Sequence, residues 1–221
     1  MQDPQSQWTA IDNYFAAHLI PPDAALDAAL QSATAANLPN IHVAPNQGKL
    51  LHLLAQSINA TRILEIGTLA AYSTIWLARA LPPTGQLITL EANPTHAEIA
   101  RKNIARANLS HLIQLLEGPA LTTLPTLNPP FDLIFIDADK PPLPDYFSWS
   151  LKLSHPGTLI IADNVVRRGA ILNPDSPDPA VQGVRRLVDL IARSPHVSAT
   201  TLQTVGPKGH DGLLLARVLT V

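Results

Sequence analysis

Acidic side chains close a series of short apolar segments in the middle of the chain. Glu65, Glu91, Asp137 and Asp163 stand at or beside the ends of four such segments, and Glu117 closes a fifth. In an open parallel sheet, ligands bind beyond the carboxyl ends of the strands. A single acid at such a position usually caps a helix or is solvated, whereas several at one edge predict a binding site.

Asp137 and the pair Asp163-Asn164 would lie side by side if their segments form neighbouring strands. Ligand sets made only of oxygen select a hard divalent cation, Mg²⁺ before Ca²⁺, and Mn²⁺ is a further candidate. Lys140 comes shortly after Asp137, and a nearby cation disfavours its charged form, so it is a candidate general base. The alternative is that both acids cap helices and that the lysine is a solvated surface residue.

The segment around Gly67 indicates which class of organic cofactor the site could bind. EIGTLAAYS permits a tight turn at Gly67 but lacks the second and third glycines of GxGxxG, which disfavours NAD. Glu91 closes the next apolar segment, near the position where Rossmann-like sites bind ribose hydroxyls. S-adenosylmethionine (SAM) fits both facts, because it carries a ribose and a sulfonium but no phosphate.

The elements that must position these residues alternate between strand and helix. Unbroken apolar runs, typical of strands buried on both faces, are TRILEIG (61–67), QLITLE (86–91), LIQLLE (112–117), FDLIFID (131–137) and GTLIIAD (157–163). Helix-length segments between or after them are 72–81, 95–107, 143–153 and 179–194, the last with Asp178 as its N-cap. This alternation predicts an α/β fold with a doubly wound, mostly parallel sheet.

Both ends of the chain add elements to this core. SATTLQT and GLLLARV, separated by a turn with Gly206, Pro207 and Gly209, predict an antiparallel hairpin at the sheet edge. The first sixty residues predict three helices, whose apolar positions include Trp8, Ile11, Tyr14, Phe15 and Leu19 in the first. We expect a single domain over 1–221, with a helical cap at 1–60 and a Rossmann-like core at 61–221.

Composition excludes several classes of protein. Among 221 residues there is no cysteine, which rules out disulfides, Fe–S clusters and a thiol nucleophile, and the eight histidines show no HExxH spacing for zinc. A net charge of −2 argues against a nucleic-acid-binding surface. The N-terminus lacks the features of a signal peptide, and no stretch approaches 18 apolar residues, so we expect a cytoplasmic protein that does not enter membranes.

Several segments together resemble a known family. ILEIGTLAAYSTIWLARALP, EGPAL, FDLIFIDADK, GTLIIADNV and LQTVGPKGHDG are similar to the divalent-cation-dependent O-methyltransferases of the catechol and caffeoyl-CoA type, which are class I SAM enzymes. The resemblance extends from about Ile41 to the C-terminus. It implies a seven-stranded sheet, a homodimer, and transfer of a methyl group to one oxygen of an ortho-dihydroxy small molecule.

The resemblance also implies a role for individual residues. The cofactor would contact Val43, Glu65, Gly67, Thr68, Ser73, Glu91, Ala120, Asp137 and Asp139, with the methionine end at residues 43 and 65–73, the ribose at Glu91 and the adenine near Ala120 and Asp139. Asp137, Asp163 and Asn164 would bind the metal, and Lys140 would be the base. The chain departs from the family at Ala71, where glycine is usual and a methyl group would crowd the cofactor loop, at Pro141-Pro142, and at His210, where tryptophan is common.

Three alternatives stay open at this point. The run Asn128-Pro129-Pro130-Phe131 matches a motif of adenine methyltransferases, but it precedes a strand and so falls at the wrong edge of the sheet. A hydroxylated nucleoside in tRNA is another possible acceptor, with Arg167-Arg168 and Arg185-Arg186 as phosphate contacts. A regulatory module that only binds the cofactor would leave the metal ligands and Lys140 without a task.

Overall fold

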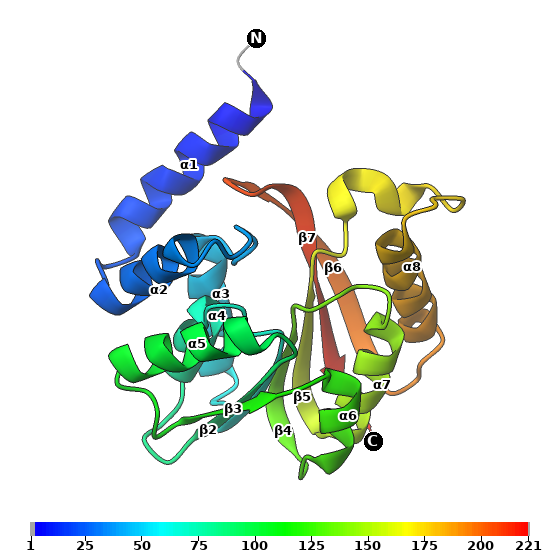
Figure 1. The fold of residues 1–221 in the computed structure, drawn as a ribbon. Helices are drawn as coiled ribbons and strands as arrows, with labels where there is room; N and C mark the ends of the chain where they lie inside the picture. Colours follow the sequence, from blue (N-terminus) through cyan, green and yellow to red (C-terminus); the bar gives the residue numbers. More distant parts are fainter. Residues whose placement is uncertain (1–2, 221) are drawn as a thin grey trace.

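A computed structural model describes residues 3–220 of the chain. Its centre is a seven-stranded sheet in the order β3-β2-β1-β4-β5-β7-β6 (Figure 1). The strands are β1 (Arg62–Ile66), β2 (Gln86–Glu91), β3 (Ile113–Glu117), β4 (Phe131–Ile136), β5 (Ser154–Asp163), β6 (Val197–Gly206) and β7 (Gly209–Val218). Strands β1 to β5 are parallel, and β7 runs antiparallel to both β5 and β6. The predicted sheet and its antiparallel hairpin are confirmed. Within the hairpin, β7 lies between β5 and β6, so β6 is the edge strand at this side of the sheet.

Helices cover both faces of the sheet. One side carries α2 (Ala24–Ala35), α3 (Pro45–Ser57), α4 (Tyr72–Ala78) and α5 (Pro94–Arg106), and the other carries α6 (Ala120–Thr123), α7 (Leu143–Lys152) and α8 (Pro179–Ala192) (Figure 1). Asp178 caps α8 as predicted, its carboxylate accepting a hydrogen bond from the backbone N–H of Ala180 at 2.8 Å. Two short 3₁₀ helices, η1 (Leu124–Thr126) and η2 (Arg167–Leu172), together with α6, were not predicted, because single turns are too short to show helical periodicity.

The hydrophobic core consists of two layers, one on each side of the sheet. Successive residues of a strand face opposite sides, so Ile63 packs with Leu51 of α3 while Leu64 packs with the layer that contains Phe147 of α7. All four of these side chains are at most 1% exposed. The unbroken apolar runs follow from this double coverage. Helices α2 and α3 share a core with the sheet.

Helix α1 (Pro4–Leu19) differs from the other long helices. It follows the predicted apolar spacing, yet none of its described residues is buried, and Ile11, Tyr14, Phe15 and Leu19 are between 47% and 65% exposed. It lies against α3 and β6 at the top of the molecule (Figure 1). Over residues 3–220, no helix combines the length and apolar character needed to cross a bilayer.

The strand register brings the acidic residues to one edge. Ile66 pairs with both Leu90 and Ile136, and Ile136 pairs with Ala162. The residues that follow these positions are Gly67, Glu91, Asp137 and Asp163, and they therefore share one level of the sheet.

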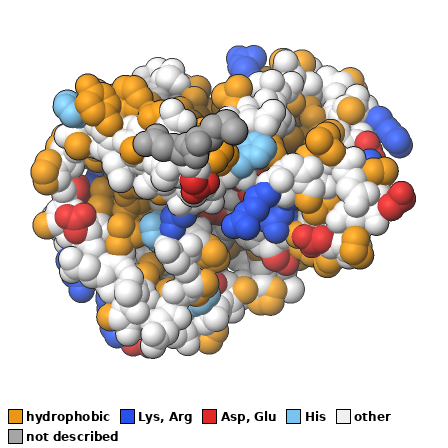
Figure 2. Space-filling model, turned by 90° about the horizontal axis from the view of Figure 1, so that it is seen from above, with side chains coloured by type: hydrophobic (Ala, Val, Ile, Leu, Met, Phe, Trp, Pro, Cys, Tyr) orange, Lys and Arg blue, Asp and Glu red, His pale blue; other side chains and the backbone are white. Residues whose placement is uncertain are grey.

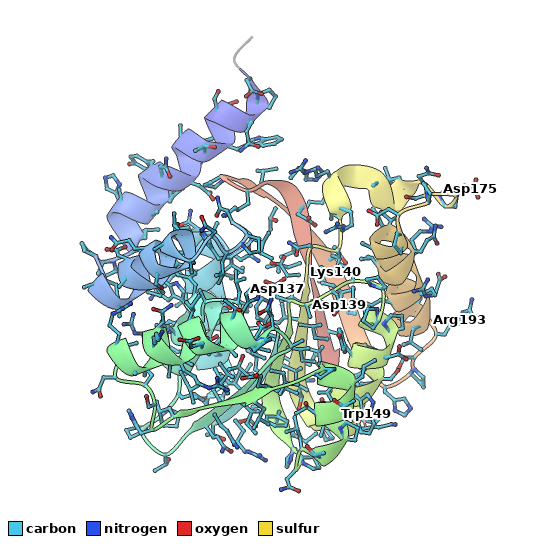
Figure 3. All side chains as sticks on the ribbon, viewed as in Figure 1. Asp137, Asp139, Lys140, Trp149, Asp175 and Arg193 are labelled. Carbon is cyan, nitrogen blue, oxygen red and sulfur yellow. The ribbon has the colours of Figure 1, made fainter. Side chains whose placement is uncertain are left out.

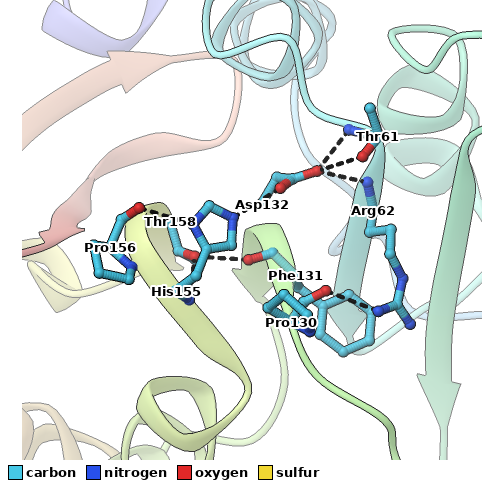
Figure 4. A network of polar contacts seen from close by, with 8 residues as sticks. All are labelled: Thr61, Arg62, Pro130, Phe131, Asp132, His155, Pro156 and Thr158. Carbon is cyan, nitrogen blue, oxygen red and sulfur yellow. Dashed lines mark hydrogen bonds and ion pairs between the residues drawn. The ribbon is translucent and has the colours of Figure 1, made fainter. Parts of the chain in front are cut away.

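Asp132 connects the amino ends of three strands on the opposite side of the molecule (Figure 4). One carboxylate oxygen accepts hydrogen bonds from the backbone N–H of Thr61 at 2.7 Å and of Arg62 at 2.8 Å, and the other contacts His155 Nε2 at 2.9 Å. The starts of β1, β4 and β5 are thereby joined. The segment 128–130 enters β4 at this edge, which agrees with the prediction that the proline-rich motif lies away from the ligand site.

Candidate functional site

A cavity of about 790 Å³ opens at the carboxyl edge of the parallel strands. Its wall combines the segments after β1, β2, β3 and β4 with residues 41–43 and with Asn164 and Arg167. Figure 2 shows this upper face, where Lys and Arg side chains gather near the centre beside histidine and acidic side chains. The cavity is thus built from the strand ends that the sequence singled out.

Gly67 allows the loop after β1 to pass against the end of β4. Its φ is +98°, and a Cβ at this position would lie 2.1 Å from the carbonyl oxygen of Asp137. Glycine is required on both counts, because other residues avoid this conformation and the backbone oxygen cannot yield. The tight turn brings Thr68 and Ser73 into the cavity wall.

Glu65 lies beneath this loop and does not reach the cavity surface. Its side chain is fully buried, and its carboxyl group accepts hydrogen bonds from the hydroxyls of Ser73 at 2.6 Å, Thr89 at 2.7 Å and Thr74. Burial raises the pKa of Glu65 to about 7 despite these hydrogen bonds. Among the predicted cofactor residues, Glu65 is thus placed to act through Ser73.

Glu91 lines the cavity and is held by the backbone. Its carboxylate accepts hydrogen bonds from the N–H groups of Thr68 at 3.2 Å, Leu69 at 2.8 Å and Asn93 at 2.9 Å. An ionised carboxylate has about four acceptor positions, so these bonds leave room for a hydroxyl donor such as that of a ribose. The same contacts make Glu91 a structural anchor of the loop after β1.

The remaining predicted cofactor residues, Val43, Ala120 and Asp139, line the same cavity. The hydroxyl of Tyr146 on α7 donates to Asp139 at 2.7 Å. Burial and this contact with Asp139 raise the pKa of Tyr146, so its phenol stays protonated and orients the carboxylate. Tyr146 was not predicted, because nothing in the sequence of α7 distinguishes it from a core aromatic residue.

Asp137, Asp163 and Asn164 meet where β4 and β5 end. Asp137 and Asn164 line the cavity, while Asp163 is only 5% exposed and accepts a hydrogen bond from Gln47 of α3 at 2.6 Å. Burial and the negative charge of Asp137 raise the pKa of Asp163 to about 7, with Lys140 acting in the opposite direction. Over residues 3–220 no three His, Asp or Glu side chains cluster as a metal site. The set predicted from the sequence has two carboxylates, and its third member is the amide of Asn164.

Lys140 projects into the same group, and Figure 3 shows it beside Asp137 and Asp139 above the strand ends. It is 7% exposed, and its Nζ lies 3.4 Å from a carboxylate oxygen of Asp137. Helix α8 supports its backbone: a Cβ at Gly183 would lie 2.0 Å from the carbonyl oxygen of Lys140. Arg186 of α8 also donates to the carbonyl of Pro141 at 2.9 Å. The segment that carries the lysine is therefore fixed by α8.

The departures from the family pattern fall in different places. Ala71 has a left-handed φ of 65°, as expected where glycine is usual, but its methyl group lies in the core and does not line the cavity. Pro142 precedes α7 and lines the cavity. His210 contacts Gln203 at 2.8 Å and lies outside the cavity wall.

Comparison with known proteins defines the class. The family model described as O-methyltransferase matches residues 22–219, and the chain belongs to this family. The fold and the predicted family are thereby confirmed.

Particular relatives narrow the comparison. A catechol O-methyltransferase of Niastella koreensis is 54% identical over 95% of this chain and 96% of its own length. The O-methyltransferase of Bacillus cereus, solved in complex with SAH (S-adenosylhomocysteine), is 55% identical with a TM-score of 0.95, covering 96% of this chain and 99% of that one. TomG of Streptomyces achromogenes, an O-methyltransferase solved with SAM, is 49% identical with a TM-score of 0.96, covering 99% and 100% of the two chains. The chain is a SAM-dependent O-methyltransferase.

Proposed function

We propose that the protein transfers the methyl group of SAM to one hydroxyl of an ortho-dihydroxy aromatic molecule of the catechol type, with the help of a divalent cation. The observation that carries this proposal is the juxtaposition of four residues at one side of the cavity: Asp137, Lys140 and Asn164 line it, and the buried Asp163 lies beside Asp137. The catechol O-methyltransferase of Niastella koreensis supports the same acceptor class.

The donor set fits a hard cation. Asp137, Asp163 and Asn164 offer only oxygen ligands, the kind that Mg²⁺, Mn²⁺ and Ca²⁺ accept. The neighbouring carboxylates of Asp137 and the buried Asp163 repel each other, and Lys140 offsets only part of that repulsion. A divalent cation held there would lower the pKa of an acceptor hydroxyl and orient it.

The chain's own residues would perform the remaining tasks. Lys140 would take the proton of the acceptor hydroxyl at Nζ, and Gly183 and Arg186 hold its backbone in position. Glu91 would bind the ribose, while Ser73, oriented by Glu65, would hold the methionine end together with Val43. Holding the two reactants at contact distance is worth up to roughly 7–11 kcal/mol of the barrier.

Cation dependence tests the proposal. We expect SAM-dependent methylation of catechol to vanish with EDTA and to return with Mg²⁺ or Mn²⁺. Asp163→Ala should abolish turnover but keep the rise in melting temperature caused by SAH, because the proposed task of Asp163 is to bind the cation and not the cofactor. Glu117→Ala is the matched control, since Glu117 also ends a strand but forms an exposed ion pair with Arg101. Full turnover in EDTA would contradict the proposed dependence of methyl transfer on a divalent cation.

We also propose that the protein is a cytoplasmic homodimer. The exposed apolar side chains Ile11, Tyr14, Phe15 and Leu19 on α1 support an interface there. Sedimentation velocity should give a dimer for the native protein and a smaller species for Tyr14→Asp. A monomeric native protein at micromolar concentration would contradict the proposal.

A further inference from the structure

Arg167 places a cationic side chain at the cavity wall. It lines the wall together with Lys140 and Asn164. Its Nε is shielded from solvent and has no hydrogen-bond partner among residues 3–220. None of the ion pairs found among residues 3–220 includes Arg167. A buried donor of a charged group without an acceptor is costly and rare in native proteins. A partner for this guanidinium must therefore come from the cavity, either as water or as an anionic group of a ligand.

The backbone around Arg167 is held in place by β7. Arg167 has a left-handed φ of 54°, which is unfavourable for a residue with a Cβ. One oxygen of Asp211 accepts hydrogen bonds from the N–H groups of Val166 at 3.0 Å and Arg167 at 3.1 Å, and the N–H of Val165 donates to Gly212 at 3.1 Å. The strained turn is therefore fixed to the sheet.

The other arginines in the two predicted pairs have different surroundings. Arg185 donates to the carbonyl of Ile171 at 2.7 Å, so it supports η2. Arg186 supports the segment after Lys140, as described above. Arg168 is exposed. Arg167 alone among the four is a cavity residue, and its position after β5 sets it apart from the β1 and β2 loops that form the proposed cofactor side.

We propose that Arg167 binds a carboxylate of the methyl acceptor, so that the substrates are ortho-dihydroxy aromatic acids. This inference rests on the proposed function and names its substrate class. A guanidinium pairs with a planar carboxylate through two parallel hydrogen bonds, whereas a neutral catechol would leave the charge unpaired.

Acceptor preference tests the inference. The probes are protocatechuate, its neutral amide and dopamine, assayed with SAM and Mg²⁺. The wild type should prefer protocatechuate over the amide at least about tenfold in kcat/KM, because hydrogen bonds to charged groups correspond to roughly 10- to 150-fold. Arg167→Gln should remove most of this preference, and Arg167→Lys should retain part of it. Arg168→Gln is the matched control and should keep the wild-type preference.

Binding measurements separate this inference from the proposed function. Calorimetry on the SAH complex with Mg²⁺ should show protocatechuate binding that Arg167→Gln weakens by about tenfold or more, whether or not methyl transfer follows. Methylation of all three probes without preference for the acid would overturn the inference and leave the proposed function standing. Weaker SAH binding in Arg167→Gln, with the acceptor preference intact, would also overturn it, because the arginine would then bind the carboxylate of the cofactor.

Discussion

Gly183 offers a way to displace the proposed base without touching it. An alanine Cβ at this position would lie 2.0 Å from the carbonyl oxygen of Lys140, whereas ordinary contacts begin near 3.4 Å. The added Cβ is fixed to the backbone of α8 and meets backbone atoms of Lys140 and Pro141, so α8 and the segment after β4 must separate by about 1.4 Å. Overpacking of this kind costs roughly 1–3 kcal/mol. The higher helix propensity of alanine returns about 1 kcal/mol.

Gly183→Ala should therefore destabilise the protein by up to about 2 kcal/mol. For a chain of this length, that loss corresponds to a fall in Tm of up to about 8 °C. Displacement of a catalytic group by about 1 Å can reduce turnover about 100-fold. We expect a kcat for catechol lowered to that extent. The rise in Tm on adding SAH should largely persist, because Val43, Ser73 and Glu91, the proposed contacts to the methionine end and the ribose, lie outside the displaced segment.

Thermal melts and initial rates for Gly183→Ala, beside Asp189→Ala on the exposed face of α8, provide the test. The control should change stability by no more than about 0.5 kcal/mol and leave kcat intact. A Gly183→Ala protein with a higher Tm and normal turnover would refute the reasoning, because α8 would then move freely relative to Lys140.

Three further changes test other parts of the structure. Lys140→Met should lower kcat about 10²- to 10⁴-fold with little effect on SAH affinity by calorimetry, and near-normal turnover at neutral pH would show that Lys140 is not the base. His155→Gln should lower Tm more at pH 5.5 than at pH 8. Asp132 raises the pKa of His155, and the ion pair loses its stabilising effect as the pH rises through the raised pKa. Because the pair is partly exposed, the effect should be no more than about 1 kcal/mol. The buried carboxyl of Glu65 keeps its proton up to about pH 7, whereas the unfolded chain releases it near pH 4.5, so the ligand-free protein should lose about 3 kcal/mol of stability between pH 4.5 and 7. Glu65→Gln should abolish this loss in denaturant titrations at the two pH values.

The sheet could be predicted because each buried strand is an unbroken apolar run with an acid at or beside its end. By that rule Glu91 and Asp137 were expected at the ligand site, and both line the cavity. Glu65 comes one residue before the end of β1, faces the hydroxyls of α4 and does not line the cavity. The exposure of the apolar residues on α1 could not be predicted either, because apolar spacing indicates a helix but not which surface covers its apolar face.

Contacts between distant residues could not be predicted. Gln47 and Asp163 are 116 residues apart, and their hydrogen bond depends on how α3 lies against the end of β5. The same limit applies to the turn at Arg167, which Asp211 stabilises from β7 across 44 residues. No local pattern signals either contact, because each is a product of the tertiary fold.

The position of β7 has a consequence for the order in which the enzyme is made. Leu213 of β7 pairs with Asp163 at the end of β5, so β5 has a free edge until residues 209–218 have left the ribosome. Every other element of the site is synthesised earlier and must wait for this strand, while an unpaired apolar edge invites aggregation. A nascent chain stalled before residue 209 should therefore depend on chaperones and lack the folded site.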